Sequence, residues 1–226
     1  MTLRGGDAAH LLRFTNVAKR FGAQVALRSV DCSFSAGEIV LLLGANGAGK
    51  STLLKLGAGL LRADAGSIEK SVERPGYVGH DPMLYAELTV EENLNFFSAL
   101  YPNESHPSHL LSAWGLASQR NKKISELSRG MQLRTSLVRT LLSDPALLLL
   151  DEPTSALDDE GVELLSSTIR ACANIEGRAG TVIIATHDVE RLRRIATRIV
   201  LLTQGKVEKD SKSCEEVISV YRQRNR

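Results

Sequence analysis

Residues 44–51 read Gly-Ala-Asn-Gly-Ala-Gly-Lys-Ser, and their types and spacing fit a phosphate-binding loop. Glycines allow the backbone to curl so that successive N–H groups point at phosphate oxygens, and the start of a following helix adds partial positive charge. In such a loop Lys50 is expected to reach the β- and γ-phosphates of a nucleotide, and the Ser51 hydroxyl to bind Mg²⁺. The predicted nucleotide-binding residues of this segment are Gly44, Ala45, Asn46, Gly47, Ala48, Gly49, Lys50, Ser51 and Thr52.

Two adjacent acids are a second candidate for chemistry. Asp151 and Glu152 follow four leucines, residues 147–150, which are typical of a buried strand. An aspartate at the end of such a strand can face the Mg²⁺ held by Ser51, and Glu152 is placed to activate the attacking water as general base. An acidic pair at a strand end is usually solvated surface. Combined with the phosphate loop, however, it predicts hydrolysis of a nucleoside triphosphate.

Alternating strands and helices are expected to position these residues. Short apolar or β-branched runs predict strands at 13–17, 26–33, 38–43, 146–150 and 181–185, and a hairpin at 198–207. Apolar residues at helical spacing predict helices at 50–61, 162–172 and 187–195. The phosphate loop would then follow a buried strand and open a helix. This order predicts an α/β fold with a mostly parallel sheet covered on both faces.

The middle of the chain shows helices without intervening strands. The segment Thr89-Val-Glu-Glu92 is a capping box that begins one helix, and further helices are expected near 109–118 and 130–142. We therefore expect one domain over 1–226, with a core at about 1–86 and 143–226 and an inserted helical subdomain at about 87–142.

The segment Leu127-Ser-Arg-Gly-Met-Gln132 resembles the signature motif of ATP-binding-cassette (ABC) proteins, from whose commonest form Arg129 and Met131 depart. The resemblance implies a P-loop NTPase core with an N-terminal antiparallel β subdomain. It also implies that ATP and Mg²⁺ are bound between two cassettes, in a homodimer or with a paired subunit. The residues that would cap the partner's ATP are Ser128, Gly130 and Gln132. Taken alone, a serine before a helix is simply an N-cap.

Other residues match the same family in order and spacing. Phe21 stands where the family places an aromatic ring that stacks on adenine, and His187 resembles the histidine that contacts the γ-phosphate. Residues 155–158 resemble the loop that crosses the dimer interface. His80 takes the place of a glutamine common in relatives. A neutral imidazole offers one accepting nitrogen, so a role for His80 at the metal stays open.

Residues 78–97 together with 128–132 are most similar to the ATP-binding subunit of the haem exporter in cytochrome c maturation. Exporters of drugs or lipids share much of this pattern and remain an alternative. A soluble ABC ATPase without a transport role is an alternative of another class. Because the sequence has one cassette and no predicted membrane-spanning segment, the membrane domain of a transporter is expected to be another polypeptide. The resemblance therefore implies an integral membrane permease as partner and a cytoplasmic, peripheral location on the inner face of the cell membrane.

The net charge, the apolar runs and the cysteines give no indication of a nucleic-acid partner, a membrane-spanning segment or a cysteine metal site. A net charge of +2 over 226 residues gives no argument for nucleic acid as partner. No apolar run approaches the roughly 18 residues that cross a bilayer. Cys32, Cys172 and Cys214 are not at the spacing of metal ligands. The arginines at 222, 224 and 226 are expected to be a solvated basic end.

Overall fold

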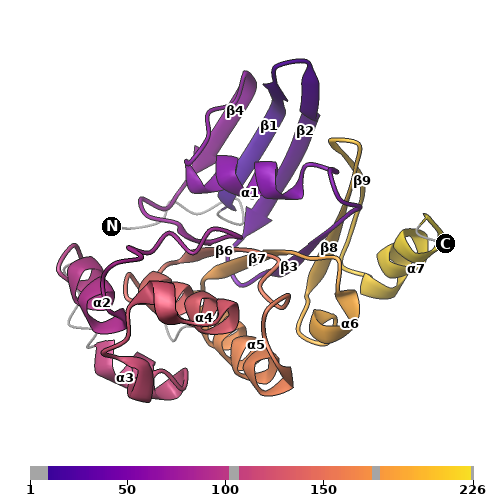
Figure 1. The fold of residues 1–226 in the computed structure, drawn as a ribbon. Coiled ribbons are helices and arrows are strands. Elements are labelled where there is room, and N and C mark those ends of the chain that lie inside the picture. The colour runs from indigo at the N-terminus through magenta and orange to yellow at the C-terminus, as the bar shows by residue number, and fades with distance from the viewer. Residues whose placement is uncertain (1–9, 102–106, 175–178, 225–226) are drawn as a thin grey trace.

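The computed structural model describes residues 10–101, 107–174 and 179–224, which form two sheets (Figure 1). The smaller sheet is antiparallel, with strand order β2 (Gln24–Ser35), β1 (His10–Phe21) and β4 (Ala65–Lys70). The larger sheet has the order β5 (Gly76–Val78), β6 (Leu147–Asp151), β7 (Thr181–Ala185), β3 (Ile39–Leu43), β8 (Arg198–Thr203) and β9 (Lys206–Ser211). Its neighbours are parallel except β8 and β9. The expected α/β fold is thereby confirmed.

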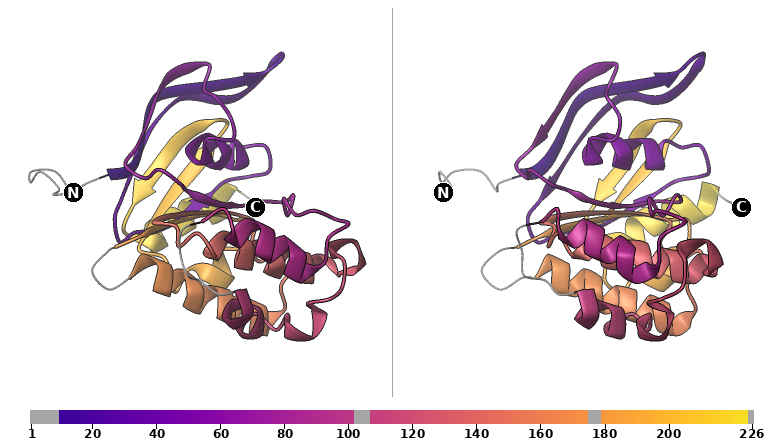
Figure 2. Two further views of the ribbon diagram at one scale, coloured as in Figure 1. Left: turned by 90° about the vertical axis from the view of Figure 1, so that its left-hand side faces the viewer. Right: turned by 60° about the vertical axis from the view of Figure 1, so that its left-hand side comes forward.

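The helices are α1 (Lys50–Ala58), α2 (Val90–Ser98), α3 (Pro107–Ala113), α4 (Arg129–Leu141), α5 (Asp159–Ala173), α6 (Val189–Leu192) and α7 (Cys214–Arg224). Two short 3-10 turns, η1 (Ala117–Gln119) and η2 (Ile124–Glu126), lie between α3 and α4. Helix α1 lies between the two sheets, whereas α2 to α5 gather on the opposite side of the larger sheet (Figures 1 and 2). No helix in the described ranges is both long and apolar enough to span a membrane.

The larger sheet is buried on both faces because each strand contributes alternate residues to two cores. Val40 and Leu42 of β3 pack with α1 and the smaller sheet. Ile39, Leu41 and Leu43 pack in the core that contains α4 and α5. All five residues of β3 are buried, as its continuous apolar run predicts. The strand that leads into the glycine loop is therefore rigidly held.

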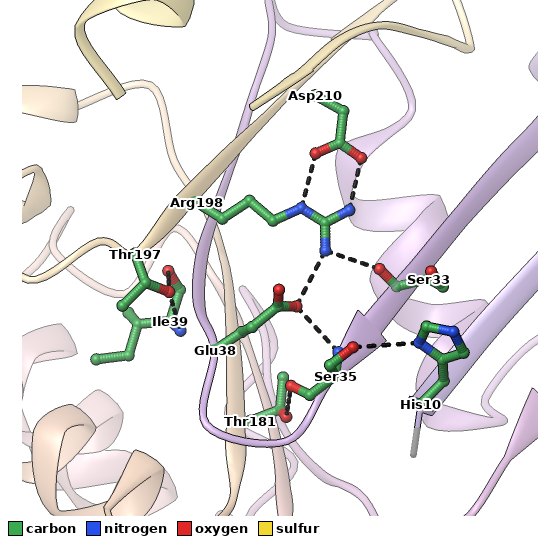
Figure 3. Close-up of polar contacts among 9 residues, drawn as sticks. All are labelled: His10, Ser33, Ser35, Glu38, Ile39, Thr181, Thr197, Arg198 and Asp210. Atoms are coloured by element: carbon green, nitrogen blue, oxygen red, sulfur yellow. Dashed lines mark hydrogen bonds and ion pairs between the residues drawn. The ribbon is translucent and has the colours of Figure 1, made fainter. Parts of the chain in front are cut away.

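Arg198, at the start of β8, links the smaller sheet to the larger one through hydrogen bonds and ion pairs (Figure 3). Its guanidinium forms a bidentate pair with Asp210 of β9, with N···O distances of 2.7 and 2.6 Å. Its Nη1 also donates to the Ser33 carbonyl of β2 at 2.9 Å and to Glu38 at 3.0 Å. The hydrogen bond to Asp210 raises the pKa of Arg198, although burial opposes this. One side chain thus ties β2, β8 and β9 at the end of the sheet away from the glycine loop.

Several elements differ from the sequence expectation. The capping box is present, with Thr89 accepting from the Glu92 amide, but the helix expected at 109–118 already ends at Ala113. Gly115 follows with φ 66°, a conformation that ends helices. The expected helix at 187–195 is only the short α6, which leaves His187 in the preceding loop.

As predicted, Arg222 and Arg224 are exposed to solvent, but they belong to a helix that the sequence analysis did not predict. Residues 214–224 form α7, in which Arg222 pairs with Glu190 and Arg224 with Glu208. Val217 and Ile218 are buried against the larger sheet's helical side. Arg226 lies outside the described residues. Arg222 and Arg224 therefore belong to an amphipathic helix that packs on the core through Val217 and Ile218.

Candidate active site

The glycine loop, residues 44–51, connects β3 to α1 as the sequence predicts. Gly49 precedes α1 with φ 105°, and a Cβ there would lie 2.6 Å from the Ala26 carbonyl oxygen. On the other side, the Gly205 amide donates to the Ala48 carbonyl at 3.0 Å. The loop is therefore held between β2 and the turn that joins β8 to β9.

Lys50 is turned back into this loop. Its Nζ donates to the Gly44 carbonyl at 2.7 Å and to the Ala45 carbonyl at 3.3 Å, and the side chain is buried. Burial lowers the pKa of Lys50, while the nearby acids Glu152 and Asp151 act to raise it. Carbonyl oxygens are neutral acceptors, so a phosphate would be a stronger partner for this ammonium.

Asp151 ends β6 and has an unsatisfied buried oxygen. In the described part of the chain its Oδ1 has no hydrogen-bond partner. Burial raises the pKa of Asp151, and the Ser51 hydroxyl beside it opposes this shift. An unpaired buried carboxylate oxygen next to a hydroxyl is an oxygen site for a hard cation such as Mg²⁺.

The protein alone supplies few ligands at this position. No group of three His, Cys, Asp or Glu side chains within the described ranges is arranged to hold a metal. Mg²⁺ commonly takes one or two protein oxygens together with water and substrate phosphates. Ser51 and Asp151 therefore fit a Mg²⁺ that arrives with a nucleotide.

Glu152 leaves β6 with an unusual backbone conformation, at φ 51°. Its amide donates to the Ala185 carbonyl of β7 at 2.8 Å, which fixes this turn. The side chain then meets His187: Oε2 lies 2.8 Å from Nδ1 and accepts from the His187 amide at 3.3 Å. The fold thus brings together the two residues predicted to be catalytic, although 35 positions separate them.

A cavity of about 240 Å³ runs over the glycine loop. It is lined by Phe21, Gln24 and Ala26 of the smaller sheet, by residues 46–52 and by Glu152. Phe21 is 48% exposed there and is not a core residue. The ring predicted to contact adenine and the loop predicted to bind phosphate therefore share one cavity.

A separate cleft of about 310 Å³ lies on the other side of Glu152. Asp151, Glu152 and Gln132 line it, together with Arg129 and His80, which are two of the three positions that depart from the family's commonest motifs. Ser128 caps α4 by accepting from the Met131 amide at 3.3 Å, and Gln132 donates to the Ile124 carbonyl at 3.0 Å. Neither Ser128 nor Gly130 lines the cavity over the glycine loop. A single chain does not bring them to its own phosphate loop.

The sequence did not indicate two further residues of the site. Tyr77 of β5 is buried, its hydroxyl has no partner in the described ranges, and burial together with Asp151 raises its pKa. Gly205 was expected only as a hairpin turn, but a Cβ there would lie 2.6 Å from the Ala26 carbonyl, so it packs under the glycine loop. Tyr77 is the middle residue of the three-residue strand β5 and Gly205 lies in a turn, so neither gave a local signal of a role in the site.

Comparison with known proteins agrees with this geometry. The family described as ABC transporter matches residues 27–155. The chain is 36% identical over 197 residues to a fluoroquinolones export ATP-binding protein of Mycobacterium tuberculosis, with 82% of this chain and 64% of that protein covered. It is 35% identical over 209 residues to Nod factor export ATP-binding protein I of Burkholderia lata, with 85% and 68% covered. The chain thus spans about two thirds of the length of these relatives.

Among solved structures, a dimeric ATP-binding cassette in a post-hydrolysis state, bound to ADP and Pi, has a TM-score of 0.79 at 26% identity, with 88% of this chain and 97% of that chain covered. The ATP-binding subunit of an ABC transporter has the same TM-score at 25% identity, with 93% of each chain covered. The sequence match includes the glycine loop and Asp151-Glu152, and the structural match extends over both sheets. This protein therefore belongs to the ABC transporter family and has the fold of the family's ATP-binding cassette.

Proposed function

We propose that this chain binds MgATP and hydrolyses it as the ATP-binding subunit of an ABC transporter. The observation that carries the proposal is what lies beside the glycine loop: the Lys50 ammonium, which donates to two carbonyl oxygens, and near it the buried Asp151 oxygen that has no hydrogen-bond partner in the described ranges. An ammonium bonded to neutral carbonyl oxygens and a buried carboxylate oxygen without a partner in the described ranges, next to one glycine loop, complement a nucleotide phosphate and its metal.

Each residue then has a role. Lys50 and the amides of residues 44–52 bind the phosphates, and the exposed ring of Phe21 stacks on the base. Ser51 and Asp151 hold Mg²⁺, which when bound neutralises phosphate charge. Glu152 accepts a proton from the attacking water, and His187 orients the Glu152 carboxylate and contacts the γ-phosphate.

We further propose that the nucleotide is enclosed by a second cassette, either a copy of this chain or a paired subunit. Ser128, Gly130 and Gln132 lie around the start of α4, where free amides and the helix dipole favour an anion. Since they do not reach the glycine loop of their own chain, they would cap the nucleotide of the partner. In this arrangement residues 87–142 form the helical subdomain and the rest forms the core.

The transport role requires a membrane partner, and we propose an integral permease that the cassette contacts from the cytoplasmic side. Relatives named for the export of fluoroquinolones and Nod factor favour an exporter. Other relatives are named for sulfate/thiosulfate import, so similarity of the cassette does not by itself indicate the direction of transport. Export of haem rests on the sequence resemblance of residues 78–97 and 128–132.

Titration with MgATP tests the proposal. Lys50→Ala removes the phosphate-binding ammonium, so the expected result is loss of measurable binding with an unchanged circular dichroism spectrum. Lys70→Ala, an exposed lysine of β4, is the matched control and should bind as the wild type does. Equal affinity of the Lys50→Ala and wild-type proteins would refute the assignment of the phosphate loop.

A further inference from the structure

The Tyr77 hydroxyl and the Oδ1 atom of Asp151 are buried polar atoms that lack hydrogen-bond partners in the described part of the chain. Each of the two residues is only 7% exposed. A buried hydroxyl or carboxylate oxygen without a partner costs free energy, so its presence in a native fold calls for an explanation, such as a catalytic role or a bound ion. The two atoms are therefore candidates for a function beyond packing.

The two side chains share one face of the larger sheet. Strands β5 and β6 are parallel with Tyr77 opposite Leu149, so Asp151, two residues further along β6, lies on the same face as Tyr77. Tyr77 and Leu149 both belong to the core on the side of α1, the helix that follows the glycine loop. Burial raises the pKa of the Tyr77 hydroxyl, and the Asp151 carboxylate raises it further. The hydroxyl therefore lies within the influence of the Asp151 carboxylate.

Gly79 leaves the space into which the Tyr77 ring extends. A Cβ at position 79 would lie 2.4 Å from the Tyr77 hydroxyl oxygen and 2.7 Å from two carbons of the ring. Gly79 does not have a positive φ, so its backbone conformation does not require glycine. The ring explains the glycine instead, because the Tyr77 side chain extends along β5 toward the end of the sheet where β6 places Asp151.

We infer that Tyr77 is a positioning residue of the metal site, whose hydroxyl donates to the Asp151 carboxylate when that carboxylate binds Mg²⁺, an inference that rests on the proposed function. A carboxylate has about four lone-pair positions, so Asp151 can bind a cation and still accept a hydrogen bond. Hydrogen bonds from outer side chains fix the orientation of metal-binding carboxylates. Tyr77 can supply this bond because no other group engages its hydroxyl in the described ranges.

Binding of a fluorescent, non-hydrolysable ATP analogue to the full chain, titrated with MgCl₂, tests this inference without hydrolysis. Tyr77→Phe removes the hydroxyl and keeps the ring that fills the core. The variant should need about tenfold more Mg²⁺ for the half-maximal gain in analogue binding, the lower end of the effect of an outer partner. Its affinity without Mg²⁺ should equal that of the wild type, because Lys50 and the glycine loop are unchanged. Its thermal unfolding temperature without nucleotide should be unchanged or raised, since the hydroxyl it loses is unpaired there.

Tyr85→Phe provides the comparison, because it removes the same group from a tyrosine that is 51% exposed and packs against Phe96 and Phe97. It should match the wild type in every measurement. An unchanged Mg²⁺ requirement in Tyr77→Phe would overturn the inference. A lower unfolding temperature, or an equal loss of analogue binding with and without Mg²⁺, would also overturn it, because either result indicates a structural role for the hydroxyl. A wild-type chain that does not bind the analogue, or binds it without responding to Mg²⁺, would instead overturn the proposed function, and the inference with it.

Discussion

Asp151 and Glu152 are adjacent in the chain, but the fold gives their carboxylates opposite surroundings. Asp151 is buried at the end of β6, with one oxygen unpaired in the described ranges. Glu152 turns away through a backbone conformation at φ 51° and engages His187. Such strained residues gather at functional sites, where the surrounding structure maintains them. Asp151 thus has a carboxylate oxygen available to bind a cation, and the Glu152 carboxylate is oriented by its contacts with His187.

Asp151→Asn should stabilise the chain in the absence of nucleotide while abolishing hydrolysis. Burial raises the pKa of Asp151 in the folded state, so its ionised form opposes folding at neutral pH. The favourable contribution of Asp151 is complete below its unfolded pKa and is lost as pH rises through the folded pKa. We expect a gain on the order of 1 kcal/mol in the free energy of unfolding at pH 7.

Urea denaturation over a range of pH measures this effect. The advantage of Asp151→Asn should shrink as pH falls toward about 4, the ordinary pKa of an aspartate. Asp159→Asn is the control, since its side chain is 98% exposed and pairs only at the surface with Arg191. A variant less stable than the wild type at pH 7 would mean that the Asp151 carboxylate is satisfied in the folded chain.

Gly49→Ala should be far more damaging than Gly22→Ala, although both glycines have positive φ. A Cβ at position 49 would lie 2.6 Å from the Ala26 carbonyl, whereas a Cβ at position 22 has no neighbour within 4 Å. Gly22→Ala is expected to lower the free energy of unfolding by about 1 kcal/mol through backbone strain alone. Gly49→Ala should exceed this and lose MgATP binding, as nucleotide titration and thermal unfolding would measure. Similar losses in both variants would contradict the close packing of the loop on β2.

At the scale of elements, the position of the glycine loop depends on how the smaller sheet is attached to the larger one. Arg198→Met removes the guanidinium that pairs with Asp210 and Glu38, whose side chains are 30% and 12% exposed. Breaking such a network should cost about 2 to 3 kcal/mol, because the two carboxylates lose their partner. Arg222→Met breaks an exposed pair with Glu190 and should cost less than about 0.5 kcal/mol. Chemical denaturation of both variants distinguishes a network that links the sheets from ordinary surface pairing.

The sequence predicted the elements whose signals are local. The buried run of β3, the capping box of α2 and the strand that ends in Asp151 each have a pattern that depends on near neighbours, and all are confirmed. Strand β4 was not predicted, since Ala65–Lys70 is mostly exposed and is a strand only because β1 pairs with it. Helix α7 was not predicted either, because only Val217 and Ile218 are buried in it and its apolar pattern is weak.

For the candidate site, residue types and spacing predicted which side chains gather but not how they are held. The pairing of Glu152 with His187 follows from β6 and β7 being neighbours in a parallel sheet, so the predicted order of elements already favoured it. The contact of His80 with Arg129 could not be predicted, because it depends on how the loop after β5 meets α4. Contacts between side chains on loops depend on tertiary packing that no local pattern encodes.

At the scale of the whole molecule, the cavity over the glycine loop and the first turn of α4 are separate in one chain. In the proposed site, Phe21 and the loop would form one side of the nucleotide site, and Glu152 lines both the cavity and the cleft. A second cassette would complete the site by placing its own Ser128 over the first cassette's loop. Nucleotide and assembly are then linked, because ATP stabilises the paired state that binds it.

Glu152→Gln should therefore trap the ATP-bound pair. The substitution keeps size and shape but removes the base, and loss of a general base costs on the order of 10² to 10⁴ in rate. Binding should survive, because Lys50, Ser51 and Asp151 still face MgATP. With ATP, the variant is expected to elute as a dimer on size exclusion, while the wild type, which empties the site by hydrolysis, stays mainly monomeric without a membrane partner. Adding Lys50→Ala to the variant is the control, since it should abolish both binding and dimerisation. Hydrolysis at the wild-type rate would place the base elsewhere, and an inactive, ATP-binding monomer would show that hydrolysis and assembly are not linked.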